Sequence, residues 1–155
     1  MQTDEEAKAY VQKELQYHPD FIKIWYIALG NADSSARASL HLVKTVIDEA
    51  HAHHLKVAVH ATEKITAQLA VENGADYLVH SVDDKIIDDA FIQLLTQHHV
   101  ILCPTLQVAD NYIKTFTQRY QPSDAYKSLS NAEALNSLSC LSTLPDTAFV
   151  NFYKR

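Results

Sequence analysis

The sequence predicts an α/β fold built from parallel β/α units, and three observations support this class. Short segments rich in branched and aromatic residues alternate with longer segments whose apolar residues recur every three or four positions. The chain has 155 residues, of which 47% are hydrophobic, enough for one domain-sized core. Strands that alternate with helices at this spacing are expected to be parallel, because a parallel neighbour needs a crossover long enough to hold a helix.

Four segments are predicted as strands. Residues 21–27 are aromatic and branched, residues 56–60 read Lys-Val-Ala-Val-His, and shorter apolar runs occupy residues 76–80 and 100–103. The second strand is unusual, since a buried strand normally ends in turn residues and this one ends in a histidine.

Helical spacing fills the stretches between the strands. The expected helices lie at residues 4–17, at 36–50, from a cap at Thr62 to Gly74, from Asp83 or Asp84 to Leu95, and after a cap at Asn131. From residue 104 onward the pattern loosens, and no further strand is convincing.

Composition excludes two classes of partner. The formal net charge is −6 without a basic run, whereas nucleic-acid binding relies on Lys and Arg to neutralise phosphates. No stretch is long and apolar enough to span a membrane.

The start, MQTDEEAKAY, has no features of a secretory signal, which weakly favours a cytoplasmic location unless a signal lies in a missing N-terminal part of the parent protein. Two cysteines are too few for a disulfide framework, and Cys103 is expected to be a buried small hydrophobic residue.

Three predicted strands each hold one ionisable residue in an apolar frame, namely Lys23, His60 and His80. The carboxyl ends of parallel strands form the active face of β/α folds, so these side chains can converge there. A lysine buried among apolar residues would be a neutral amine, and two neutral imidazoles suit zinc or a similar metal. Taken singly, a strand histidine is more often a hydrogen-bonded core residue, and a strand lysine more often extends its charge to solvent. The joint pattern favours a metal site.

Four motifs, in this order, resemble the metal-dependent amidohydrolase superfamily, and in particular its imidazolonepropionase-like and Xaa-Pro dipeptidase-like members. They are DFIKIW at 20–25, EAHAHHLKVAVHA at 49–61, AVENGADYLVHS at 70–81 and Pro104-Thr105-Leu106. The resemblance spans residues 4–106, and the ordered set is far more specific than any one motif.

Members of that superfamily are (β/α)8 TIM barrels, which typically need about 250 residues. The resemblance therefore implies a partial barrel of four parallel βα units, corresponding to the fourth to seventh strands, within residues 1–106. Residues 107–155 are then expected to form a helical and irregular extension of the same domain.

The resemblance also implies roles for single residues. Lys23 would be a carboxylated lysine that bridges two metals through a carbamate derived from carbon dioxide, and His60 and His80 would bind the second metal, a divalent ion such as zinc. Such enzymes hydrolyse C–N bonds of small-molecule substrates, such as dipeptides and other open or cyclic amides, through a metal-activated water. Tyr26 and Asp83 are candidates for the substrate pocket, although core packing for Tyr26 and a helix cap at Asp83 are simpler interpretations.

The family pattern requires further residues that this chain does not show. A His-x-His on the first strand and an aspartate on the last strand have no counterpart, so no catalytic residue is identified. His51-Ala52-His53 has the letters of that pair but sits at a helix end, where we expect a structural hydrogen bond from His51 instead. The expectation is an internal piece of an enzyme that is weakly active or inactive alone.

Two alternatives stay open. The first is a catalytically inactive remnant that serves as a binding or oligomerisation module, since an unclosed sheet leaves two edges for self-association. The second is an open flavodoxin-like sheet that binds a phosphate ligand. It is disfavoured because Gly30 and Gly74 are the only glycines and form no glycine-rich loop.

Overall fold

The computed structural model describes residues 2–116 and 119–140. The chain divides into two compact units, Met1–Thr105 and Leu106–Arg155. Whether residues 107–155 extend the same domain stays a prediction. Among the described residues no helix combines the length and apolar character needed to cross a bilayer.

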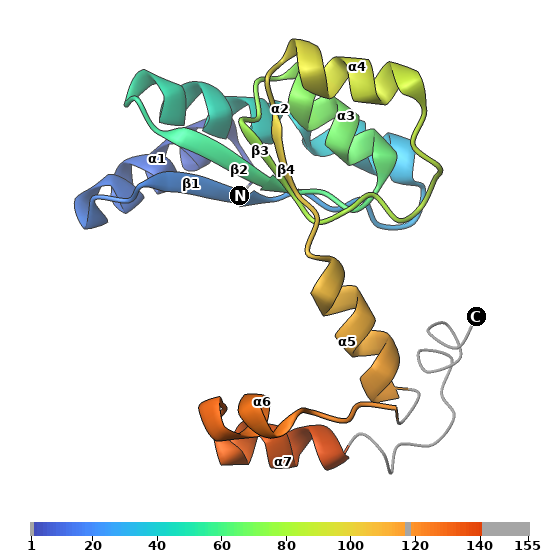
Figure 1. Cartoon of the computed structure of the whole chain (residues 1–155). Coiled ribbons are helices and arrows are strands. Elements are labelled where there is room, and N and C mark those ends of the chain that lie inside the picture. Colours follow the sequence, from blue (N-terminus) through green and yellow to red (C-terminus); the bar gives the residue numbers. More distant parts are fainter. Residues whose placement is uncertain (1, 117–118, 141–155) are drawn as a thin grey trace. The chain divides into compact units, whose positions relative to one another are not determined.

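The first unit alternates helices and strands along the chain (Figure 1). Its elements are α1 (Asp4–Glu14) with a 3₁₀ turn (Leu15–Tyr17), β1 (Phe21–Trp25), α2 (Ala32–Ala52), β2 (Lys56–His60), α3 (Lys64–Glu72), β3 (Tyr77–Val79), α4 (Asp89–Gln97) and β4 (Ile101–Cys103).

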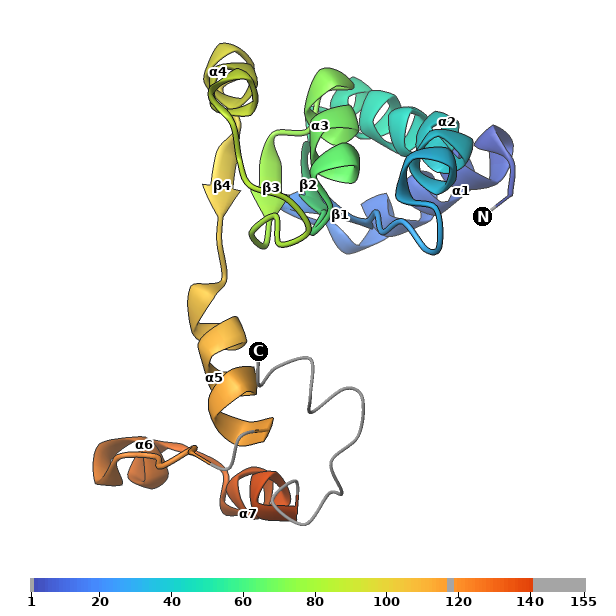
Figure 2. The ribbon, with the colours of Figure 1, turned by 90° about the vertical axis from the view of Figure 1, so that its right-hand side faces the viewer.

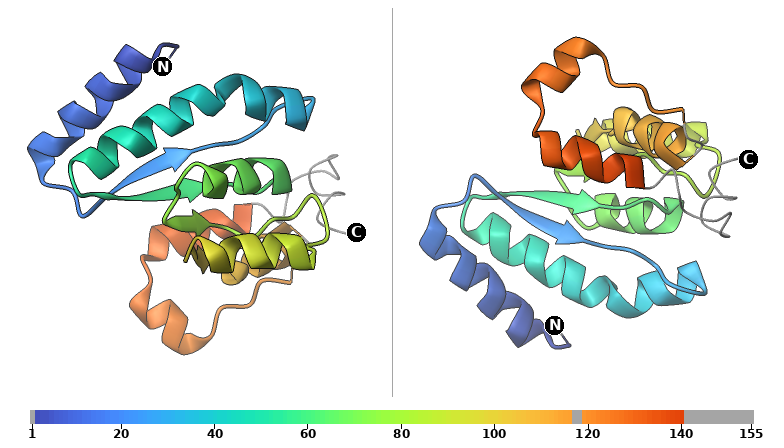
Figure 3. Two further views of the ribbon diagram at one scale, coloured as in Figure 1. Left: turned by 90° about the horizontal axis from the view of Figure 1, so that it is seen from above. Right: turned by 90° about the horizontal axis from the view of Figure 1, so that it is seen from below.

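The four strands form one sheet in the order β1-β2-β3-β4, and every neighbouring pair is parallel. The predicted class of parallel βα units is thereby confirmed. Helices α2, α3 and α4 lie on one side of this sheet (Figure 2), and the view from below in Figure 3 shows β1 and β2 in front of α2 and α3. The opposite face of the sheet therefore has no helix of this unit over it.

The core lies between the sheet and its helices. Side chains of β1 alternate between buried and exposed, with Ile22 and Ile24 buried and Phe21 and Trp25 exposed. This is the period of two expected of a strand with one face covered. Strand β2 contributes Val57 and Val59 to the core, and the side chains that meet them from the helices and β3 include Val43, Val46, Ile47, Ala50, Val71 and Leu78.

Two predicted helix starts were wrong. Thr62 does not cap α3, because Glu63 is its N-cap residue and the Thr62 hydroxyl instead donates to the Glu63 carboxylate at 3.3 Å. Helix α4 begins at Asp89 with Asp88 as its cap, not at Asp83 or Asp84. The reason is that Asp84 serves another helix, where its carboxylate accepts a hydrogen bond from the Lys64 N–H at the start of α3, at 2.7 Å.

The second unit contains α5 (Leu106–Phe116), α6 (Asp124–Leu129) and α7 (Ala132–Cys140). Asn131 caps α7 as predicted, since its side chain accepts from the Ala134 N–H at 3.0 Å. Helix α5 was not predicted, although its residues have a strongly amphipathic order. The apolar spacing of this predicted helix also includes Leu141 and Leu144, which lie outside the described residues.

Candidate metal centre

The register of the sheet places two of the candidate ligands, Lys23 and His60, on its uncovered face. Lys23 lies opposite Ala58, and Trp25 lies opposite His60, which in turn lies opposite Val79. Residues opposite each other in a parallel pair share a face, so Lys23 and His60 point to the same side of the sheet. His80 follows the last residue of β3 directly.

The two histidines are in contact. The ring centroids of His60 and His80 are 4.3 Å apart in an edge-to-face arrangement, at the carboxyl ends of β2 and β3. On the other side of β2, the ring centroid of Trp25, the last residue of β1, lies 5.3 Å from the ring centroid of His60. The side chains of residues 60 and 80, predicted separately from two strand ends, thus lie side by side.

Both imidazoles are held toward their neutral form. Burial lowers the pKa of His60 below its ordinary value, and the nearby charges of His80 and Lys23 lower it further. Burial and the Lys23 charge likewise lower the pKa of His80. A metal binds only the unprotonated imidazole nitrogen, so this environment favours metal binding.

His80 has a partner for one ring nitrogen. Its Nδ1 lies 2.7 Å from the Thr105 hydroxyl oxygen, which follows β4. Whether Nδ1 donates to this oxygen or accepts from it depends on the tautomer of the imidazole. A histidine that binds a metal through one ring nitrogen usually makes a hydrogen bond through the other.

The expectation that Lys23 is buried among apolar residues is wrong. The lysine is exposed rather than buried, because it lies on the face of β1 that no helix of its unit covers. The burial on which that expectation depended is therefore absent. Alternation along a strand predicts two faces, but it does not show which of them is covered.

The described residues contain no group of three or more His, Cys, Asp or Glu side chains able to hold a metal ion. A site here would consist of His60, His80 and an oxygen ligand made from Lys23. His51 and His53 do not supply the missing pair, since they lie at the C-terminal end of α2, which leads into the start of β2. His51 Nε2 instead lies 2.8 Å from the Asp76 carboxylate, the structural hydrogen bond predicted for it.

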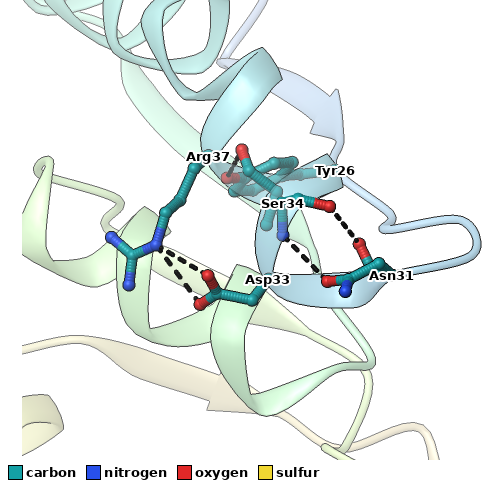
Figure 4. A network of polar contacts seen from close by, with 6 residues as sticks. Tyr26, Asn31, Asp33, Ser34 and Arg37 are labelled. Atoms are coloured by element: carbon teal, nitrogen blue, oxygen red, sulfur yellow. Dashed lines mark hydrogen bonds and ion pairs between the residues drawn. The ribbon is translucent and has the colours of Figure 1, made fainter.

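Tyr26 is part of the core. Its side chain is 2% exposed, and its hydroxyl donates to the Ala36 carbonyl at 2.7 Å. Burial raises the pKa of this hydroxyl to about 12. Figure 4 shows the tyrosine beside the first turn of α2, where the Asn31 carboxamide accepts from the Ser34 N–H and Arg37 pairs with Asp33. Its hydroxyl thus links the residue after β1 to the first turns of α2. Core packing, the simpler of the two interpretations of Tyr26, is what the structure shows.

Asp83 lies in the loop after β3, near the strand ends. Its N–H donates to the Thr62 carbonyl at 2.9 Å, which ties this loop to the one after β2. Partial burial and the carboxylates of Glu63 and Asp84 raise the pKa of Asp83. Asp83 therefore remains near the candidate site, without being a cap.

Cys103 differs from its prediction, since it is exposed at the end of β4 rather than buried.

Three residues near the site were not singled out from the sequence. Trp25 is 74% exposed beside His60. It lies two positions after Lys23 and therefore on the same face of β1, so a lysine and a tryptophan at this spacing were the available sequence signal for an uncovered face. Glu63 accepts from the Thr66 hydroxyl at 3.0 Å and lies 3.4 Å from the Ala28 N–H, so it joins the loops after β1 and β2. Thr105 belonged to a recognised motif, but no sequence signal indicates that its hydroxyl meets His80.

Comparison with known proteins gives similarity at the level of structure. No family model matches the sequence, and no curated protein matches it either. Among solved structures, a prolidase complexed with N-methylphosphonate-L-proline superposes with a TM-score of 0.62 at 23% identity, covering 90% of this chain and 36% of that one. A Xaa-Pro dipeptidase with methionine in its active site gives 0.60 at 22% identity, covering 79% and 30%.

An ochratoxinase from A. niger gives a TM-score of 0.61 at 18% identity, covering 92% of this chain and 30% of that one. The chain thus spans about a third of the length of the structures that it matches. At these identities the likeness concerns the fold. The chain therefore has the fold of about a third of each of these solved structures, a set of parallel βα units as predicted.

Proposed function

We propose that this chain binds a divalent metal, zinc in the first instance, through His60 and His80, with Lys23 as a third ligand after carboxylation. The contact between the two imidazoles at the strand ends, with Lys23 on the same face, is the observation that supports this most directly. The protein to which this barrel segment belongs would hydrolyse an amide C–N bond. The names of the matched structures, which include a prolidase, a dipeptidase and an amidohydrolase, support this class of reaction.

The chain's own residues would act by binding and orientation. His60 and His80 supply neutral nitrogen donors, and the Thr105 hydroxyl orients the second of them. Exposure of Lys23 allows carbon dioxide to reach its side-chain nitrogen. The amine, once it has lost a proton to water, would attack the carbon of carbon dioxide and release a second proton, which would leave an anionic carbamate oxygen as the ligand. A bound divalent metal would supply Lewis acidity for the carbonyl group and would lower the pKa of water. The described residues include no His-x-His at a strand end, so we expect little or no turnover from the chain alone.

Zinc binding can be measured by competition with a chromophoric chelator and by metal analysis of the purified chain. We expect one zinc per chain, with affinity at least about 10-fold weaker in His60→Ala and in His80→Ala, since each removes one donor. His41→Ala is the matched control, because His41 is an exposed histidine paired with Asp4 on α1, away from the strand ends. Equal zinc binding in all four proteins would exclude the site.

The role of Lys23 needs a separate experiment. If Lys23 is carboxylated, bicarbonate should strengthen zinc binding to the wild-type chain and have no effect on Lys23→Ala. An unchanged affinity with and without bicarbonate would leave a two-histidine site and remove the carbamate from the proposal.

A second candidate function is assembly through the open sheet. The uncovered face and the edge strands expose Phe21, Trp25, Ile101 and Leu102, which are 51%, 74%, 58% and 43% exposed. Unpaired edges and an apolar face favour pairing with another chain. Sedimentation velocity should then show oligomers that persist with chelator and that weaken in Ile101→Lys. Ile86→Lys is the control, since Ile86 is 93% exposed in a loop. A chain that is monomeric at all concentrations would exclude this function.

A further inference from the structure

The ends of β3 and β4 are joined by a side-chain contact between two unusual residues. His80 Nδ1 and Thr105 Oγ1 are 2.7 Å apart. His80 has a φ of 80° and Thr105 a φ of 30°, both in the left-handed region that non-glycine residues seldom adopt. Such conformations cost energy and persist where surrounding contacts impose them, which occurs most often at functional sites.

The backbone around this contact is fixed independently of the threonine side chain. The His80 N–H donates to the Cys103 carbonyl at 2.9 Å, and the Ser81 hydroxyl donates to the Pro104 carbonyl at 3.1 Å. These bonds hold the two loops together whether or not residue 105 has a hydroxyl. The Thr105 hydroxyl therefore acts on the His80 ring itself.

A neutral imidazole has one N–H and one lone pair, and the partner of one nitrogen determines the state of the other. If Nδ1–H donates to the threonine oxygen, the lone pair is on Nε2, and the ring can donate electrons from that atom. If the hydroxyl donates to Nδ1 instead, Nε2 holds the proton and cannot bind a metal.

We propose that Thr105 is a positioning residue that holds His80 as the Nδ1–H tautomer, so that Nε2 is the nitrogen available to a ligand-binding centre shared with His60. The use of this nitrogen for a metal rests on the proposed function, whereas the tautomer is a property of the metal-free chain. The two can therefore fail separately.

The tautomer can be read from long-range ¹H–¹⁵N correlation spectra of the metal-free chain at about pH 8, above the ordinary titration of imidazole. The chain has nine histidines, so the His80 signals are assigned by their loss in His80→Gln. We expect a single Nδ1–H form in the wild-type chain and a mixture of tautomers in Thr105→Val. Valine keeps the β-branched shape and replaces the hydroxyl by a methyl group, and Thr105→Ser should restore the single form.

Ser81→Ala is the matched control, because it removes a hydroxyl bond between the same two loops without touching the imidazole. It should leave the His80 tautomer unchanged. An Nε2–H form in the wild-type chain, or the same tautomer in wild type and Thr105→Val, would overturn the proposal. If Thr105→Val does not fold, the wild-type and Thr105→Ser spectra still decide the tautomer.

Zinc competition adds a second readout. Loss of an outer hydrogen bond to a metal ligand typically weakens metal affinity by about 10- to 100-fold, so we expect this loss in Thr105→Val and near wild-type affinity in Thr105→Ser and Ser81→Ala. If His60→Ala and His80→Ala weaken zinc binding but Thr105→Val does not, the positioning role is wrong and the metal site stands. If none of these variants alters zinc binding, the metal site is wrong and the tautomer result alone decides the role of Thr105.

Discussion

At the scale of single residues, the environment of His60 and His80 links folding to pH. Burial and the neighbouring Lys23 charge lower both pKa values from the ordinary 6.5. The unfolded chain then binds more protons than the folded chain once the pH falls below that value. Protonation of these two histidines therefore does not reduce the free energy of unfolding above pH 6.5. That free energy decreases as the pH falls from 6.5 through the lowered pKa values.

We expect the urea midpoint of the metal-free chain to fall between about pH 7 and about pH 5, and to fall less in a His60→Gln, His80→Gln double variant. The double variant removes the two groups whose protonation opposes folding and leaves the other histidines in place. Parallel pH profiles for the two proteins would contradict the effect.

Asp76 is a second residue whose surroundings determine its role. Its carboxylate accepts from Lys56 Nζ at 2.6 Å and from the Val57 N–H at 2.9 Å, and it contacts His51 Nε2 at 2.8 Å. Burial opposes ionisation of Asp76, but these bonds lower its pKa overall. Its contribution to stability is present above pH 3.8 and is lost as the pH falls through the lowered value.

Replacing Asp76 by Asn should lower the unfolding free energy by about 1–3 kcal/mol, because the N–H of the buried Val57 and the Lys56 ammonium lose a charged acceptor. Asp48→Asn provides the comparison, since Asp48 is 59% exposed and pairs with Lys44 on the surface of α2. Urea denaturation at pH 7 measures both. A loss in Asp76→Asn no larger than that in Asp48→Asn would show that the network is weak.

Tyr26→Phe separates core packing from a role in the site. The variant keeps the buried ring and removes the hydroxyl that donates to the Ala36 carbonyl, so it should cost about 1 kcal/mol of unfolding free energy. Zinc affinity should stay at the wild-type value, because the ring lies beneath α2. Weaker zinc binding with unchanged stability would place Tyr26 in the site instead.

At the scale of elements, the turn after α3 depends on a glycine. Gly74 has a φ of 100°, and a Cβ there would lie 3.3 Å from Ile47 Cγ2 on α2. Gly30 has a φ of 71° in the loop after β1, and a Cβ there would meet nothing within 4 Å. At both positions a side chain would strain the backbone, because φ is positive. Only at Gly74 would the added Cβ also lie close to a neighbouring side chain.

Gly30→Ala should lower the unfolding free energy by about 1 kcal/mol, from conformation alone, and Gly74→Ala should lower it by more. Thermal and urea unfolding of the two variants give the difference. Equal losses would mean that Ile47 moves aside at no cost.

At the scale of the first unit, the sheet is paired at its centre and open at both edges. Strand β2 has neighbours on both sides, and Val57 and Val59 are fully buried, whereas β4 exposes Ile101 and Leu102. Regions with few buried contacts open first in the native state.

Amide hydrogen exchange should therefore be slowest in β2 and faster in β4 for the monomeric chain. If the open edges pair in an oligomer, β1 and β4 should gain protection as the protein concentration rises, while β2 changes little. Uniform exchange across the four strands would contradict this gradient.

Much of this arrangement follows from local sequence. The alternation of Ile22 and Ile24 with exposed neighbours, the turn at Gly74 and the order of strands and helices depend on contacts a few residues apart, which is why the parallel class could be predicted. Errors arose where a partner lies far along the chain. Asp84 was expected to start its own helix and instead caps α3, 20 residues earlier.

The sequence by itself determined which residues form strands, that these strands are parallel, and that His60 and His80 stand at their carboxyl ends. Only the tertiary structure decided which face of the sheet is covered, and with it the exposure of Lys23 and Cys103 and the burial of Tyr26. It also decided that the hydroxyl of Thr105 meets the ring of His80. Periodicity records the geometry of one segment, whereas burial and side-chain partners depend on how distant segments pack together.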